Sequence, residues 1–299
     1  MLKRLLARFG LYLTKGYTVY FYSNKKIVRR PLYGKQALMP KSHSIGYNLA
    51  HFPYYNSNLQ RLVREYQQFR KDGFSIIDVG ANIGDTLLML RQTTDNRIHC
   101  FEGDPFYFKL LQENAKGIDR CYLHPVLLSD KPASLKVRNR INLGTSEFTE
   151  DAGGELSEFD SIDTYAAKHF PMEPIGVIKS DTDGFDLKVI RGAAKTITAH
   201  QPLLFIEYDR ALFEKNGDEG LPFLEFLDGL GYQGALFYDN FGKLLCITSL
   251  GEKNTIRSLH DYIRESGITF PFYDLVLFPA RDGAFFDSFS AAELVFFEA

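Results

Sequence analysis

Short apolar runs and amphipathic stretches alternate along most of the chain. Strand-like runs occupy residues 74–79, 97–101, 121–127, 176–179 and 203–207. Apolar residues at helical spacing predict helices over 59–71, 85–91, 105–115, 185–198 and 220–230. This alternation is typical of an α/β fold with a doubly wound, mainly parallel sheet. Three more strand-like runs follow, at 234–238, 244–248 and 273–278.

Two regions depart from the alternation. Residues 1–56 are rich in tyrosine and predict an N-terminal extension with short strands at 18–22 and 27–30, ahead of a main domain over 57–299. Within 129–172, Ser134–Arg138 predicts an added strand, and the polar, glycine-containing stretch 139–156 predicts a long loop. We therefore expect 139–172 to be a loop insertion, either a wall of the functional site or a surface segment without a role.

The turn after the first strand of the main domain indicates a cofactor site. It has the pattern Asp78-x-Gly80-x-x-x-Gly84, and the next strand ends at Glu102. A dinucleotide site requires G-x-G-x-x-G, whose backbone amides approach a pyrophosphate. Here the middle glycine is missing, and a carboxylate before the turn would repel a pyrophosphate. A ligand with a positively charged amino acid end, such as S-adenosylmethionine, suits the site better.

Each position in this pattern has an expected role. Gly80 has no β-carbon and would let the backbone pass close to the ligand. Glu102 would accept hydrogen bonds from ribose hydroxyls, and Asp85 would favour the first turn of the next helix. A chance glycine turn could explain the glycines alone, but not the whole set. The candidate cofactor-binding residues are Asp78, Gly80, Asn82, Gly84, Asp85, Thr86, Glu102, Gly103, Asp104, and, at the expected adenine edge, Ser129 and Asp130.

The chain resembles the FkbM-type family of class I S-adenosylmethionine-dependent methyltransferases. The matching segments are 77–86, 101–105, 128–130, 161–163, 178–186, 191–193 and 202–207, of which 178–186 with 191–193 is the most diagnostic. The resemblance implies a class I, Rossmann-like sheet closed by a terminal antiparallel hairpin. It also implies S-adenosylmethionine as cofactor and methylation of a hydroxyl, often on sugars or secondary metabolites. The family usually has glutamate where this chain has Asp183 and Asp186.

Three acids are candidates for the chemistry. A hydroxyl is a poor nucleophile at neutral pH, so its methylation requires a base or a metal. Asp181 and Asp183 follow one strand and Glu207 ends the next, so these acids should meet at the carboxyl edge of the sheet. We predict that Asp181 or Asp183 is the general base and that Glu207 orients the substrate. A helix cap would explain Asp183 equally well.

Several neighbouring residues leave alternatives open. Lys179 should share the strand face of Asp181 and could pair with a carboxylate. Asp181, Asp183 and Glu207 are also oxygen ligands of the kind Mg²⁺ prefers, but no spacing requires a metal and none is assigned. His51 is an alternative base or a packed aromatic neighbour, whereas Asp186 and Lys188 are expected to be solvated.

The charge distribution is uneven although the net charge is only −2. Residues 1–64 contain twelve Lys and Arg and no acid, which leaves 23 basic against 37 acidic residues downstream, a balance of −14. Leu2, Leu5, Leu6 and Phe9 share helical spacing with basic neighbours, which fits an interfacial helix and peripheral contact at the inner membrane face. The arm could equally pack on the acidic remainder or on a second subunit of a homo-oligomer. No nucleic-acid motif accompanies it.

Apolar runs and cysteines indicate where in the cell the protein is located. No apolar run reaches the ~20 residues that span a bilayer, and Met1–Leu13 lacks the apolar core of a signal peptide. The three cysteines are far apart and predict reduced thiols in a cytoplasmic protein.

The sequence therefore favours an S-adenosylmethionine-dependent O-methyltransferase with a small-molecule or glycan acceptor. A nicotinamide-dependent Rossmann oxidoreductase would retain Glu102 but does not fit the glycine spacing. A non-catalytic protein of the same fold, binding a glycan through its basic arm, is the third alternative.

Overall fold

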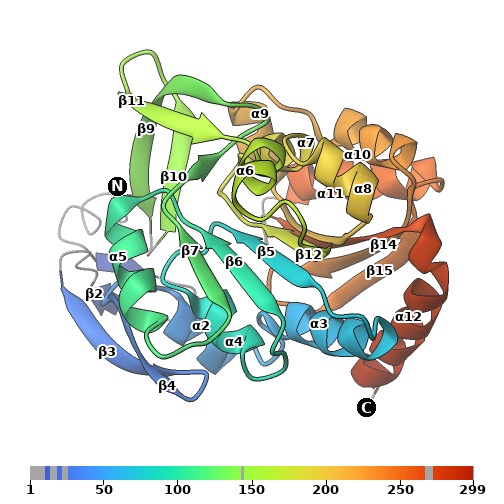
Figure 1. Ribbon diagram of the computed structural model, residues 1–299, viewed down its shortest axis with the longest axis horizontal. Helices are drawn as coiled ribbons and strands as arrows, with labels where there is room; N and C mark the ends of the chain where they lie inside the picture. Colours follow the sequence, from blue (N-terminus) through green and yellow to red (C-terminus); the bar gives the residue numbers. More distant parts are fainter. Residues whose placement is uncertain (1–10, 14–18, 22–25, 143–144, 267–271, 299) are drawn as a thin grey trace.

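An eight-stranded sheet forms the centre of the computed structural model, which describes residues 11–13, 19–21, 26–142, 145–266 and 272–298 (Figure 1). Five neighbouring strands run parallel, in the order β7 (Cys121–His124), β6 (Arg97–Phe101), β5 (Ser75–Val79), β12 (Ile175–Ser180) and β13 (Leu203–Tyr208). Antiparallel pairing then adds β16 (Tyr273–Pro279), β14 (Tyr232–Asp239) and β15 (Leu244–Ser249). The predicted mainly parallel sheet with an antiparallel hairpin is confirmed.

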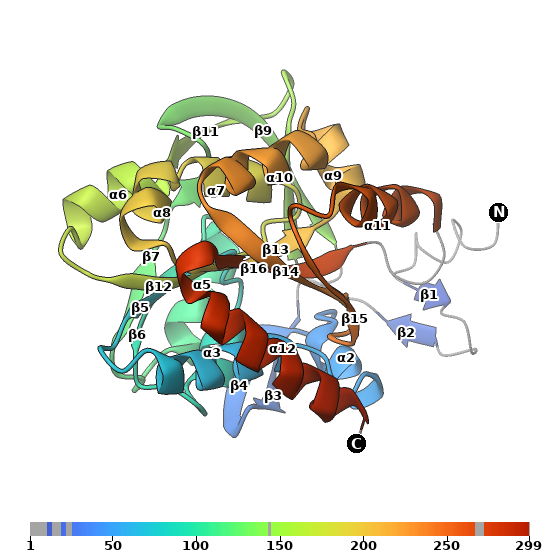
Figure 2. The ribbon, with the colours of Figure 1, turned by 90° about the vertical axis from the view of Figure 1, so that its right-hand side faces the viewer.

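Helices cover both faces of this sheet (Figure 2). One face packs against α3 (Ser57–Phe69), α4 (Asp85–Leu90), α5 (Pro105–Asn114) and α12 (Gly283–Glu298). The other packs against α6 (Ile162–His169), α7 (Asp186–Arg191), α8 (Ala194–His200), α9 (Arg210–Lys215), α10 (Gly220–Gly229) and α11 (Lys253–Ser266). The strands are buried on both faces, which explains why they appear in the sequence as nearly continuous apolar runs.

The segment 139–172 is not the predicted loop. Strands β9 (Ala133–Asn142), β10 (Thr145–Glu150) and β11 (Glu155–Asp160) form a second sheet with β8 (Leu127–Leu128). This sheet stands over one end of the central sheet (Figure 1, upper left). Among the residues of β9, β10 and β11 whose burial is described, only Val137 and Phe159 are buried, so this polar sequence carried almost no strand signal, and pairing across strands decided the structure.

Two other predicted elements are divided. The strand expected at 121–127 ends at His124, and the chain resumes as β8 in the second sheet after Pro125. The helix expected at 185–198 is interrupted between α7 and α8, where the β-carbon of any residue replacing Gly192 would collide with the backbone of Ser129. Helices α6, α9, α11 and α12 of the main domain were not predicted.

The N-terminal extension packs onto the main domain from residue 26 onward. Strands β3 (Ile27–Leu32) and β4 (Lys35–Pro40) form a hairpin, and α2 (Ile45–His51) follows. The Asn114 side chain fixes this hairpin by pairing with both backbone groups of Leu38. Strands β1 (Leu11–Leu13) and β2 (Val19–Phe21) pair with each other. The predicted interfacial helix at 2–9 lies outside the described residues.

Among the described segments, no helix combines the length and apolar character needed to cross a bilayer.

Candidate active site

A cavity lies at the carboxyl ends of β6, β5 and β12, where open α/β sheets bind their ligands. It encloses about 1150 Å³, its open mouth included. Eight of the fourteen predicted site residues line it: Gly80, Asn82, Asp85, Thr86, Glu102, Gly103, Asp181 and Asp183. The other six, Asp78, Gly84, Asp104, Ser129, Asp130 and Glu207, are not part of its wall.

The Glu102 carboxylate is held rigidly by the backbone. Its Oε2 accepts the Asn82 N–H at 2.8 Å, and its Oε1 accepts the Asp104 N–H at 2.7 Å. Burial raises the pKa of Glu102 to about 7, although these two hydrogen bonds favour the ionised form. Each oxygen can accept one more hydrogen bond, so Glu102 presents an oriented acceptor pair to hydroxyl donors in the cavity.

Gly80 lines the cavity and also allows two loops to pack closely. Its φ is +77°, and a β-carbon there would collide with the backbone carbonyl of Asp181. The glycine therefore lets the loop after β12 approach the loop after β5. Gly84 is the N-cap of α4 with φ +85°, outside the cavity wall.

Asp104 and Asp78 do not line the cavity, and each has a structural partner next to it. Asp104 caps α5 by accepting the N–H groups of Phe106 and Tyr107. Asp78 is fully buried, and its Oδ1 lies 3.2 Å from Lys179 Nζ, which is also 3.3 Å from Asp181 Oδ2. Asp78 thus pairs with a lysine instead of facing a ligand, because β12 places Lys179 opposite it in register.

The cavity wall carries an excess of negative groups. Its carboxylates are Asp85, Glu102, Asp181, Asp183 and Asp274, and Lys179 is the ammonium group among them. Burial raises the pKa of Asp85 to about 6, against the influence of Lys179. Such a wall favours a ligand with positive charge and disfavours a pyrophosphate.

An apolar wall closes the cavity beyond Glu102. It consists of Phe101, Val126, Leu127, Leu128, Phe148 and Phe159. Phe148 comes from β10, so the second sheet does contribute to the site. Ser129 and Asp130 were expected here, but the chain that leaves β8 carries Ser129 against Gly192 instead.

A buried acid that we expected to be solvated organises the loop after β12. Asp186 is fully buried and accepts hydrogen bonds from the Ser180 hydroxyl and from the N–H groups of Thr182 and Gly184. Lys188 pairs with Glu150 on β10. Phe185 is the N-cap of α7, so Asp183 does not occupy the N-cap position of that helix. Asp183 instead lines the cavity in the left-handed conformation, with φ +52°.

The N-terminal extension supplies residues that the sequence did not reveal. His43, Tyr55 and Asn56 line the cavity, and burial lowers the pKa of His43 to about 4. The predicted alternative base His51 is exposed and stacks on Tyr47. No local motif marks His43 or Tyr55, because only the packing of the hairpin β3–β4 on α4 and α5 brings them to the site.

The described part of the chain contains no group of three His, Cys, Asp or Glu side chains placed to hold a metal ion.

The strand order and the ligand cavity define a class I methyltransferase fold. A family model described as the methyltransferase FkbM domain matches residues 78–233, more than half of the chain. The chain therefore belongs to the FkbM methyltransferase family.

Solved structures of low similarity were also found. The FkbM methyltransferase from Methylobacillus flagellatus KT is 20% identical with a TM-score of 0.39, and the match covers 55% of this chain but only 40% of that one. The plantazolicin methyltransferase BpumL in complex with SAH is 10% identical with a TM-score of 0.40, covering 79% and 88%. The precorrin-6y C5,15-methyltransferase from Geobacter metallireducens GS-15 is 12% identical with a TM-score of 0.35, covering 73% and 87%. No curated protein matches the chain.

Proposed function

We propose that this protein is an S-adenosylmethionine-dependent O-methyltransferase that methylates a hydroxyl of a sugar, glycan or small metabolite. The observation that carries the proposal is the Glu102 carboxylate, fixed by two backbone amides in a cavity whose charged side chains are mainly acidic. Family membership supports methyl transfer.

The residues present fit this cofactor. Glu102 would accept hydrogen bonds from the ribose hydroxyls, and the apolar wall at Leu127 and Phe148 would cover the adenine. Asp85 would stabilise the positive charges of the sulfonium and ammonium groups. When bound, S-adenosylmethionine supplies an electrophilic methyl group to a nucleophile aligned with its carbon–sulfur bond.

The protein's own contribution is to position the acceptor and remove its proton. Asp181 and Asp183 lie on one short loop at the cavity, and Asp186 and Gly80 fix the course of that loop. Either carboxylate would take the hydroxyl proton as the oxygen attacks. Alignment of this kind can contribute on the order of 7–11 kcal/mol to catalysis, and a positioned base adds about 10²–10⁴-fold.

Calorimetry with S-adenosylmethionine and with NAD tests the cofactor. We expect binding of the first and none of the second; the reverse would favour an oxidoreductase. Incubation with methyl-labelled S-adenosylmethionine and a cell extract then identifies the labelled acceptor.

The variants Asp181→Asn and Asp183→Asn test the base. We expect one of them to lose methyl transfer while it retains cofactor affinity. Full turnover by both variants would reject these two residues as the base.

A further inference from the structure

Three carboxylates lie side by side at the carboxyl edge of the sheet. Lys179 of β12 pairs with Phe205 of β13, so Asp181 and Glu207, each two residues further on, point to the same face. Glu207 is directly opposite Asp274 of the antiparallel strand β16. Because neighbouring strands are about 4.8 Å apart, Asp181, Glu207 and Asp274 form a continuous acidic row.

The two outer acids reach the cavity, and the middle one is buried between them. Asp181 and Asp274 line the cavity, whereas Glu207 is only 7% exposed. The Oε2 atom of Glu207 is buried and has no hydrogen-bond partner. Asp274 Oδ2 accepts a hydrogen bond from Asn58 Nδ2 at 2.8 Å. A buried carboxylate oxygen without a partner is energetically unfavourable in its charged form.

Burial also sets the protonation of this pair. Burial raises the pKa of Asp274 to about 7. Burial also raises the pKa of Glu207, and the negative charges of Asp181 and Asp183 raise it further. Near neutral pH, the Glu207–Asp274 pair therefore retains a proton. A pair that holds one proton offers both a hydrogen-bond donor and acceptors, which matches a compound with neighbouring hydroxyls.

We infer that Asp274, at the cavity wall and backed by the buried Glu207, forms the acceptor-binding subsite, and that the acceptor is an uncharged compound with neighbouring hydroxyls, such as a sugar unit without phosphate or carboxylate. This inference rests on the proposed function. The acids of the cavity wall support it, because an anionic acceptor would have to enter beside Asp181, Asp183 and Asp274.

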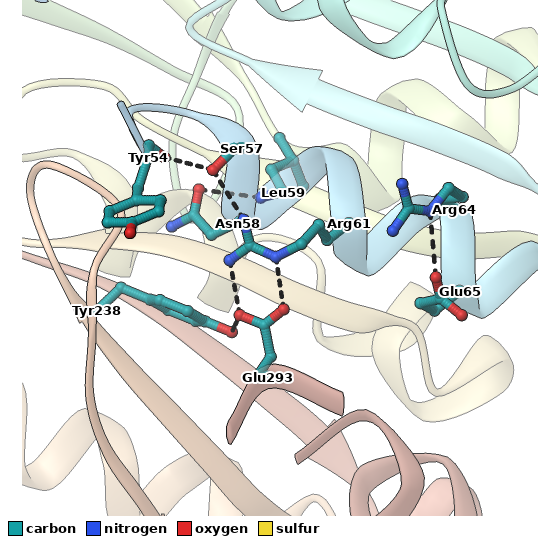
Figure 3. A network of polar contacts seen from close by, with 9 residues as sticks. All are labelled: Tyr54, Ser57, Asn58, Leu59, Arg61, Arg64, Glu65, Tyr238 and Glu293. Atoms are coloured by element: carbon teal, nitrogen blue, oxygen red, sulfur yellow. Dashed lines mark hydrogen bonds and ion pairs between the residues drawn. The ribbon is translucent and has the colours of Figure 1, made fainter. Parts of the chain in front are cut away.

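The subsite is fixed by parts of the chain outside the family segment 78–233. Asn58 and its neighbour Ser57 begin α3, and the Ser57 hydroxyl accepts a hydrogen bond from Arg61, which binds Glu293 of α12 (Figure 3). Asp274 lies on β16, also outside that segment. The family segment thus supplies the proposed cofactor residues and Glu207, and the flanking segments supply Asp274 and Asn58.

The wild-type protein tests the acceptor class. It is incubated with methyl-labelled S-adenosylmethionine and a cell extract, and the labelled product is separated by ion exchange at pH 7. We expect the label in the uncharged fraction. A labelled product retained on either an anion or a cation exchanger would overturn the inference, but it would leave the methyltransferase function standing.

The variant Asp274→Asn tests the subsite, with Asp228→Asn, an exposed acid paired with Lys253, as the matched control. We expect the apparent KM for the labelled acceptor to rise about tenfold, as for loss of a hydrogen bond to a charged group, with S-adenosylmethionine affinity unchanged. An unchanged KM would contradict the role of Asp274.

Different results would contradict the proposed function. If the wild-type protein does not bind S-adenosylmethionine, or binds it and labels no compound, the O-methyltransferase assignment itself is wrong.

Discussion

Lys179 and Asp78 face each other across adjacent parallel strands, with Lys179 Nζ 3.2 Å from Asp78 Oδ1. Both side chains are buried, and the same ammonium group lies 3.3 Å from Asp181 Oδ2 at the cavity. The lysine therefore links the carboxylate that precedes the cofactor turn to the proposed catalytic loop.

Replacing this lysine should destabilise the protein strongly. Lys179→Met leaves Asp78 buried without its counter-charge, which typically costs about 3–5 kcal/mol in the free energy of unfolding. The double variant with Asp78→Asn should recover most of that loss. Urea unfolding measures both, with the exposed Lys116→Met as control. A loss below about 1 kcal/mol in Lys179→Met would contradict the buried pairing.

Glu102→Gln should weaken cofactor binding without unfolding the protein. Glutamine retains one acceptor oxygen for the two backbone amides that Glu102 holds, and it loses the charge-assisted bonds to ribose. We expect the Kd for S-adenosylmethionine to rise about 10–100-fold by calorimetry. Glu113→Gln, at an exposed surface pair, is the control and should leave Kd unchanged.

Phe148→Ala tests whether the second sheet belongs to the cofactor site. Phe148 lies in the apolar wall, so its removal should expose the adenine and raise the Kd for S-adenosylmethionine about tenfold. Leu156→Ala, on β11 of the same sheet, removes a side chain that is 65% exposed and should have no effect. Equal behaviour of the two variants would leave the second sheet without a role in cofactor binding.

Two arginines one turn apart on α3 should differ in their contribution to stability (Figure 3). Arg61 makes a buried, two-pronged pair with Glu293, whereas Arg64 pairs with Glu65 at the surface. Arg61→Ala should cost about 3–5 kcal/mol, because Glu293 is left buried and charged. Arg64→Ala should cost less than about 1 kcal/mol. Chemical denaturation of both variants distinguishes a buried clamp from a surface pair.

The stability of the ligand-free protein should depend on pH through its buried acids. Burial raises the pKa of Asp274 and of Glu102 to about 7, above their values in the unfolded chain. Their contribution to stability is therefore complete below about pH 4 and is lost as pH rises through about 7. His43, whose pKa burial lowers to about 4, acts in the opposite sense, and its contribution is lost as pH falls from 6.5 to 4.

The variant Asp274→Asn measures the contribution of Asp274 alone to this pH dependence. The variant should show a smaller loss of unfolding free energy between about pH 5 and pH 7.5 than the wild type, measured by urea unfolding at each pH. Parallel curves for the two proteins would show that Asp274 titrates normally.

Local signals were enough to predict several residues of the cavity wall. The strand Arg97–Phe101 has the predicted bounds, because a short apolar run between polar residues is a strong local signal. The spacing of Gly80 and Glu102 placed both residues correctly at the cavity, since each directly follows a buried strand. Asp186 was misjudged, because its hydrogen bonds depend on a loop conformation that no periodicity encodes.

The sequence by itself determined the alternation of strands and helices, the family and the acids that follow the parallel strands. These features depend on residues close together along the chain, whose spacing reflects the repeat of a helix or a strand. Only the tertiary structure decided that Lys179 neutralises Asp78, that Phe148 reaches the cavity and that Asp274 lies beside Glu207. Each of these depends on the register between segments far apart in the chain, which is set by the packing of the whole core.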